Sequence, residues 1–251
     1  MYYHKKIIIS GNYVELYEYE QNLKRNFTRN KNKKKKIVEL EKEQLILDFL
    51  IEDKKETKRL HKRIDSINRT RTSIRRIINS NQDLTKFYTL TFKKNIQDVK
   101  IANRFFNKFI MKMNYRYQQL KYIAIIEFQH RGAVHYHFLC NLPYIKSREV
   151  ADVWEHGFIK IKRIKNVSNL GAYVCKYLQK DMEDERLFNK KKFFCSKNIN
   201  KPIEVYGYRA VEELILQYDL NNRKPDYETP FEHEYIGKGK YKSFEIKNIV
   251  T

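Results

Sequence analysis

The chain has 251 residues, and its 41% of hydrophobic residues are enough for one core of ordinary size with a smaller companion. Its 52 Lys and Arg residues outnumber 30 Asp and Glu residues, which gives a formal net charge of +22. Such a charge predicts a polyanionic partner, most simply a nucleic acid, and disfavours a hydrolase of small molecules. A membrane surface is the weaker alternative, because neither an amphipathic anchor nor a lipidation motif accompanies the charge.

The sequence also bounds the compartment of the protein. No apolar run approaches the ~18 residues of a membrane span, and the apolar stretch near the N-terminus is too short for a signal peptide. We therefore expect a cytoplasmic protein without a membrane partner. The three cysteines are widely spaced and include no Cys-x-x-Cys pair, which argues against a disulfide framework or a cysteine zinc site. The thiols of Cys140, Cys175 and Cys195 are expected to be buried.

Residues 6–20 resemble a small hairpin that turns at Gly11 and Asn12, for which we expect a modest structural role. The following stretch, residues 22–36, is cationic and nearly free of apolar side chains, so we expect a mobile basic segment. This segment ends in four lysines that are candidates for contacts with DNA phosphates: Lys33, Lys34, Lys35 and Lys36.

From residue 38 to about Asn79, apolar side chains recur at three- and four-residue steps among many charges, which predicts a helix. Its second half carries four arginines within about two helical turns. A solvated helix face is one interpretation of this charge run, but the basic character of the whole chain favours a helix that contacts phosphates. The four arginines are Arg69, Arg71, Arg75 and Arg76.

The centre of the chain alternates between strand-like and helix-like patterns in the order βαββαβα. This order, with a short connection between the middle strands, predicts an α+β fold in which helices pack on one face of an antiparallel sheet, of the ferredoxin-like or split βαβ kind. Strand fragments follow at residues 193–195 and 203–206, and residues 227–251 are expected to form a peripheral extension. In chain order, the predicted elements are a strand at 84–92, a helix that starts near Asp98, a pair of strands within 122–140, a helix at 147–154, a strand at 157–163 and a helix at 168–182.

Two apolar runs joined by a polar stretch with a glycine predict an antiparallel hairpin over residues 122–140. Side chains alternate between the faces of a strand, so His135 and His137 share one face while Tyr136 points to the other. With a turn in the middle of the polar stretch, Glu127 lies opposite His135 on the same face as both imidazoles. Three side chains of types that bind divalent cations are therefore predicted to converge.

A His-x-His pair on a strand is also compatible with two half-exposed imidazoles that bind nothing. Glu127 favours a metal site, because a carboxylate on a mostly apolar strand is costly to bury without a partner. Two imidazoles and one carboxylate leave coordination positions open to substrate oxygens, and both Mn²⁺ and Mg²⁺ fit this donor set.

A second group of reactive side chains lies in the predicted helix at 168–182. Tyr173 and Tyr177 are one turn apart on one face, and Lys176 and Lys180 share the adjacent face. Two tyrosines at this spacing are compatible with packing alone. Alternatively, ammonium groups stabilise a phenolate, which then attacks a phosphodiester polarised by the predicted cation. The product would be a phosphotyrosine bond to one end of a DNA strand.

Three stretches occur in the order Phe87-Tyr-Thr-Leu-Thr91, His135-Tyr-His137 and Tyr173-Val-Cys-Lys-Tyr-Leu-Gln-Lys180. Together with the sequence from Glu127 to His137 and the trailing Phe193-Phe-Cys-Ser-Lys197, they resemble the motifs of the rolling-circle replication initiators. These proteins are members of the His-hydrophobe-His (HUH) endonuclease superfamily. The resemblance covers about residues 84–202 and is to initiators from plasmids, phages or mobile elements of low-GC Gram-positive bacteria.

The resemblance implies an enzyme that nicks one strand of its replication origin with a divalent cation and a tyrosine. It implies that Tyr177, flanked by Lys176 and Lys180, is the principal nucleophile and that Tyr173 is a second tyrosine used at termination. The enzyme would stay linked to the 5′ phosphate and leave a 3′ hydroxyl for a host polymerase in the cytoplasm of a bacterial cell. The implied metal ligands are Glu127, His135 and His137.

We divide the chain accordingly into a basic accessory region at 1–83, an HUH endonuclease core at 84–202 and a C-terminal extension at 203–251. Arg131, in the turn of the hairpin, joins the basic side chains expected to contact DNA. No Gly-x-x-x-x-Gly-Lys-Ser/Thr phosphate loop occurs in the sequence, so unwinding is expected from a host helicase. A conjugative relaxase or an HUH transposase would use the same site, and a nonenzymatic DNA-binding protein would use the charge alone. The sequence indicates no oligomeric state.

Overall fold

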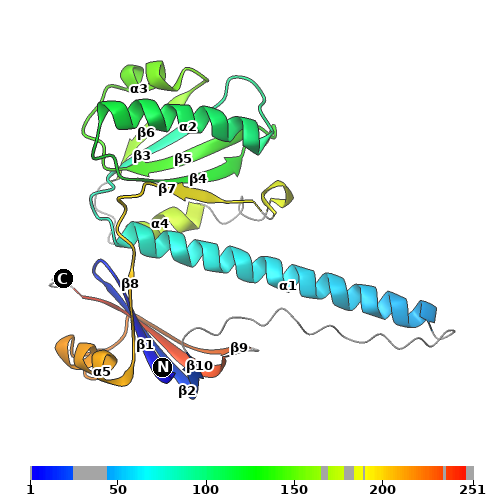
Figure 1. The fold of residues 1–251 in the computed structure, drawn as a ribbon, viewed down its shortest axis with the longest axis vertical. Helices are drawn as coiled ribbons and strands as arrows, with labels where there is room; N and C mark the ends of the chain where they lie inside the picture. The colour runs from blue at the N-terminus through cyan, green and yellow to red at the C-terminus, as the bar shows by residue number, and fades with distance from the viewer. Residues whose placement is uncertain are drawn as a thin grey trace. The chain divides into compact units, whose positions relative to one another are not determined.

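The computed structural model describes residues 2–24, 44–164, 169–177, 184–188, 190–233 and 236–246. The chain forms two compact units, each built on a five-stranded sheet. The described residues within 1–9, 13–69 and 203–251 form the first unit, and those within 10–12 and 70–202 form the second. Helices pack on both antiparallel sheets, so the predicted α+β class is confirmed (Figure 1).

The sheet of the second unit has the strand order β6-β3-β5-β4-β7. β5 pairs antiparallel with both β3 and β4, so these two strands run parallel on either side of it. This is the predicted split βαβ arrangement, and β6 extends it antiparallel to β3. The strands are β3 (Lys86–Thr91), β4 (Tyr122–Phe128), β5 (Val134–Cys140), β6 (Ile159–Arg163) and β7 (Phe193–Cys195).

One face of this sheet packs against α2 (Val99–Arg116) and α3 (Ser147–Trp154) (Figure 1). Asp98 begins α2 as predicted, because its carboxylate accepts hydrogen bonds from the backbone N–H groups of Lys100 and Ile101. Large rings fill the core on this face, and the buried Tyr136 of β5 stacks on Phe106 of α2. The odd-numbered residues of β5 must therefore point to the opposite face.

The opposite face carries α4 (Leu170–Tyr177), which packs on the end of α1 (Gln44–Asn79). This differs from the prediction of helices on one face. The reason is that β4 is buried along both faces from Ile123 to Phe128, so the second face also needs a cover. Gly171 permits the close approach of the two helices, because a Cβ atom there would lie 2.5 Å from the carbonyl oxygen of Arg75.

The sheet of the first unit has the strand order β8-β1-β2-β10-β9, and α5 (Tyr208–Gln217) covers one of its faces. The predicted hairpin turns at Gly11, which has a φ of +56°. Its expected modest role was wrong, because β1 and β2 are interior strands of this sheet. The strands are β1 (Tyr2–Ser10), β2 (Tyr13–Lys24), β8 (Ile203–Tyr206), β9 (Tyr227–His233) and β10 (Gly237–Glu245).

The cysteines and the helices bear on two further predictions. Cys140 and Cys175 are buried and Cys195 is half-buried, and all three are free thiols. Burial raises the pKa of the Cys140 thiol to about 12, which keeps it protonated and unreactive. Among the described residues, no helix has the length and apolar character needed to cross a membrane.

Candidate active site

The site is built on the β4–β5 hairpin, whose register places Glu127 directly opposite His135, as predicted. The turn is closed by hydrogen bonds from the Gln129 N–H to the Ala133 carbonyl and from the Gly132 N–H to the Gln129 carbonyl. Gly132 has a φ of +87°, a left-handed conformation that L side chains rarely adopt. The local turn chemistry therefore fixes the register that brings the carboxylate and the imidazoles together.

Three donor atoms of Glu127, His135 and His137 converge on one point. Glu127 Oε2 lies 3.0 Å from His135 Nε2 and 2.6 Å from His137 Nε2. The two Nε2 atoms lie 3.2 Å apart. The three side chains form the group of potential metal ligands found in the described part of the chain.

The dimensions of this triangle fit a divalent cation. Donor atoms at ~2.1 Å from one octahedral cation, at right angles to one another, lie about 3.0 Å apart. The three observed separations of 2.6, 3.0 and 3.2 Å bracket that value. A cation held on one face of the octahedron would keep its other coordination positions for substrate oxygens and water.

The charge state of Glu127 also fits a cation site. Burial by itself would raise the pKa of this carboxyl, but hydrogen bonds from His135 and His137, together with their positive charge, lower it to about 2. The carboxylate is therefore an anion at neutral pH. Its second oxygen, Oε1, is buried and has no hydrogen-bond partner among the described residues, which is costly unless another ligand satisfies it.

A second layer of side chains orients His137. The hydroxyl of Thr89 on β3 lies 3.2 Å from His137 Nδ1, and the ring of Phe87 stacks on the imidazole with centroids 5.1 Å apart. In the tautomer with its proton on Nδ1, His137 donates to Thr89 and directs the lone pair of Nε2 toward Glu127 and His135. The two imidazoles are 12% and 17% exposed, so substrate can reach the site while its supporting groups stay packed.

Helix α4 brings Tyr173 to the same face of the sheet. The Nζ atom of Lys162 on β6 donates a hydrogen bond of 2.9 Å to the Tyr173 hydroxyl. Lys162 shares the triad-bearing face, because Ile159 and Ile161 of the same strand pack into the core on the other face. Of the remaining predicted catalytic residues, the side chains of Lys176 and Tyr177 and the whole of Lys180 lie outside the described residues.

The side chains predicted to contact DNA are dispersed. The guanidinium of Arg131 donates to the backbone carbonyls of Phe92 and Lys93, so part of its role is to hold the turn. On α1, the exposed side chain of Arg69 donates to the carbonyl of Asp65. Arg71, Arg75 and Arg76 lie at the partly buried end of α1, and the four lysines at 33–36 lie outside the described residues.

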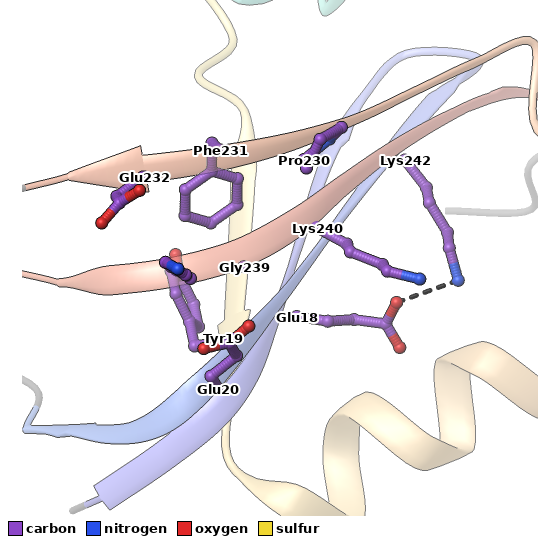
Figure 2. A pocket seen from close by; sticks show the side chains of 10 residues that line it. Glu18, Tyr19, Glu20, Pro230, Phe231, Glu232, Gly239, Lys240 and Lys242 are labelled. Atoms are coloured by element: carbon purple, nitrogen blue, oxygen red, sulfur yellow. Dashed lines mark ion pairs between the residues drawn. The ribbon is translucent and has the colours of Figure 1, made fainter.

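The largest hollow, of about 800 Å³, lies in the first unit and contains none of the triad residues. Figure 2 shows Phe231 beside Gly239, with Glu18 paired to Lys242 at 2.9 Å. Three carboxylates and three ammonium groups line the hollow, so its charges balance and do not by themselves favour a polyanion. Its lining residues are Glu18, Tyr19, Glu20, Pro230, Phe231, Glu232, Lys238, Gly239, Lys240 and Lys242.

The segment that holds the triad and α4 is similar to a known family. Residues 85–182 match the family model of replication-associated proteins of the ORF2 type. The match covers less than half of the chain and includes β3 to α4, so it supports a replication-associated role for the second unit. No curated protein and no solved structure matches the chain.

Sequence reasoning missed the roles of Thr89, Phe87 and Lys162. The first two lie in a motif that was noted only for its resemblance, and their contacts depend on the pairing of β3 with β5. Lys162 contacts Tyr173 because β6 pairs with β3 and α4 crosses the same face. The alternation of Ile159, Lys160, Ile161 and Lys162 was the available signal, since it places two lysines on one face of a half-buried strand.

Proposed function

We propose that this protein initiates rolling-circle DNA replication by nicking one strand of its origin and transferring that strand to a tyrosine. The observation that carries the proposal is the convergence of one carboxylate oxygen and two imidazole nitrogens within 3.2 Å, beside a helix with two tyrosines. The similarity of residues 85–182 to replication-associated proteins supports DNA as the substrate, as does the net charge of +22.

In the proposed site, Glu127, His135 and His137 hold Mn²⁺ or Mg²⁺. When bound, the cation neutralises the nonbridging oxygens of a phosphodiester and fixes its orientation. The phenol oxygen of Tyr177 attacks phosphorus, and the bond from phosphorus to the 3′ oxygen breaks. The 5′ side of the strand stays on the tyrosine, and the free 3′ hydroxyl serves as a primer for a host polymerase.

A second tyrosine gives the proposed reaction its second half. Tyr173 lies one helical turn before Tyr177, so both phenols can approach one phosphate position in turn. Attack by Tyr173 on the regenerated origin would release a new 3′ hydroxyl while Tyr177 still holds the first end. That hydroxyl then displaces Tyr177 and closes the replicated circle, with unwinding supplied by a host helicase in the bacterial cytoplasm.

A nicking assay on supercoiled plasmid that carries the cognate origin tests this proposal. We expect conversion to the open circle with Mn²⁺ or Mg²⁺ and none with EDTA. The double variant His135→Ala, His137→Ala should lose nicking but retain DNA binding, because phosphate contacts elsewhere provide the affinity. Full cleavage by this variant, or undiminished cleavage in EDTA, would contradict the proposal.

A conjugative relaxase or an HUH transposase is the second candidate, because either would use the same donor set and nucleophile. The choice between them depends on the DNA that is cut. Nicking confined to a replication origin supports the initiator, whereas nicking at a transfer origin or at transposon ends supports the alternatives. Binding of DNA without any nicking would favour a nonenzymatic DNA-binding protein.

A further inference from the structure

Lys162 approaches Tyr173 from a fixed position on the sheet. It lies on β6, opposite Phe87 of β3, whose ring stacks on the imidazole of His137. Lys162 is thus in the neighbouring cross-strand row to the one that contains Thr89 and His137. Its ammonium group belongs to the same face as the proposed metal ligands.

Tyr173 is equally fixed, because α4 is anchored on both sides of it. The Gly171 N–H donates to Asn79 Oδ1 at 3.0 Å, and the Cys175 thiol donates to the carbonyl of Arg71 at 3.4 Å. Both contacts join α4 to the last turns of α1 within the second unit. The Tyr173 phenol is therefore held at a defined place beside Lys162, with Nζ 2.9 Å from the hydroxyl oxygen and 5.5 Å from the ring centroid.

We propose that Lys162 is the catalytic partner of Tyr173, which orients its phenol oxygen and stabilises the phenolate that attacks phosphorus. This inference rests on the proposed function. An ammonium group that donates to a phenol oxygen favours the ionised form and directs a lone pair of that oxygen away from the donor. Lys176 and Lys180, the lysines of the tyrosine motif, are not needed for this contact.

The step balances without any further reactant. The phenol proton of Tyr173 passes to solvent, and Lys162 keeps its own protons throughout. The phenolate oxygen forms a bond to phosphorus while the bond from phosphorus to the 3′ oxygen breaks. The leaving oxygen takes the electron pair of that bond and then a proton from water.

The direct test is a pH titration of tyrosines labelled with ¹³C at Cζ in the full chain, with the Tyr173 signal assigned by its loss in Tyr173→Phe. We expect Lys162→Met to raise the measured pKa of Tyr173 by about one unit or more, and Lys162→Arg to restore most of the shift. Lys160→Met is the matched control, since Lys160 is an exposed lysine two residues earlier on the same strand and face. It should leave the Tyr173 titration unchanged.

A kinetic test then asks whether the contact matters for chemistry. Strand transfer to Tyr173 should slow about tenfold at neutral pH in Lys162→Met, with its pH profile moved to higher pH, and recover in Lys162→Arg. An unchanged Tyr173 titration in Lys162→Met, or an equal shift in Lys160→Met, would overturn the inference even if wild-type protein nicks DNA. Because the titration needs neither DNA nor metal, it remains readable if nicking fails, and failure of nicking would instead overturn the proposed function.

Discussion

Glu127 and His135 meet although they are eight positions apart, because the Gly132 turn sets a register in which they face each other. His137 joins them because it lies two residues further on the same strand, on the same face. All three members of the triad thus depend on one local hairpin. This is why the donor set was predictable from the sequence alone, whereas its supporting groups were not.

Thr89 tests whether the layer behind the triad matters. Thr89→Val keeps the β-branched shape but removes the hydroxyl that lies 3.2 Å from His137 Nδ1. Because groups of this kind fix the tautomer and orientation of a ligand, we expect Mn²⁺ affinity, measured by isothermal titration calorimetry, to fall about 10- to 100-fold.

Thr91→Val provides the control for this change. Thr91 lies on the same strand and face, but its hydroxyl donates to the carbonyl of Phe158 at 3.0 Å. We expect this variant to bind Mn²⁺ like the wild-type protein. Equal affinities for the Thr89 and Thr91 variants would show that Thr89 does not orient His137.

At the scale of elements, the packing of α4 depends on the absence of a side chain at Gly171. A Cβ atom there would lie 2.5 Å from both the Arg75 carbonyl oxygen and Asn79 Oδ1. Helix propensity alone would make Gly171→Ala stabilising by ~1 kcal/mol. We expect destabilisation of about 1–2 kcal/mol instead, because the two helices must move apart.

The single tryptophan provides the measurement. Trp154 is buried in the core of the second unit, so its fluorescence during urea unfolding reports on that unit. The free energy of unfolding should fall in Gly171→Ala and stay within ~0.5 kcal/mol of wild type in Ala172→Ser, at an exposed position of α4. A gain in stability for Gly171→Ala would show that α4 does not pack closely on α1.

The elements that sequence reasoning missed have weak local patterns. β9 contains Pro230 and alternates with charged residues, which is tolerated because β9 is an edge strand. α5 begins after Gly207 without a side-chain cap, so it lacks the usual start signal. The pairing of β1 with β8 joins Ile9 to Ile203, and no local pattern predicts a contact over such a separation.

At the scale of the molecule, this pairing changes how the basic N-terminal region can be tested. Deleting the chain up to Asn79 would remove β1, β2 and the helix end that anchors α4, so it would damage both units. Charge must be changed without removing these elements. The predicted contacts of Lys34, Lys35 and Lys36 with phosphates can be tested by substitution, since they lie outside the strands and helices described here.

We expect the triple variant Lys34→Gln, Lys35→Gln, Lys36→Gln to weaken origin binding and to reduce the slope of log affinity against log salt by about two to three. Fluorescence anisotropy over a range of salt concentrations measures this slope. The control removes the same charge from the first unit, with Lys238→Gln, Lys240→Gln and Lys242→Gln, where carboxylates surround the lysines. An unchanged slope in the first variant would assign its lysines a role other than DNA contact.

The central claim is that a tyrosine of α4 accepts a DNA strand at the Glu127, His135 and His137 site. It is tested most directly by trapping the covalent adduct on a radiolabelled origin oligonucleotide and mapping it by peptide mass spectrometry. The account predicts a metal-dependent adduct on Tyr177 in the first nick, lost in Tyr177→Phe and retained in Tyr173→Phe. An adduct confined to Tyr173, one that persists when both tyrosines are replaced by Phe, or one that forms in EDTA would contradict it.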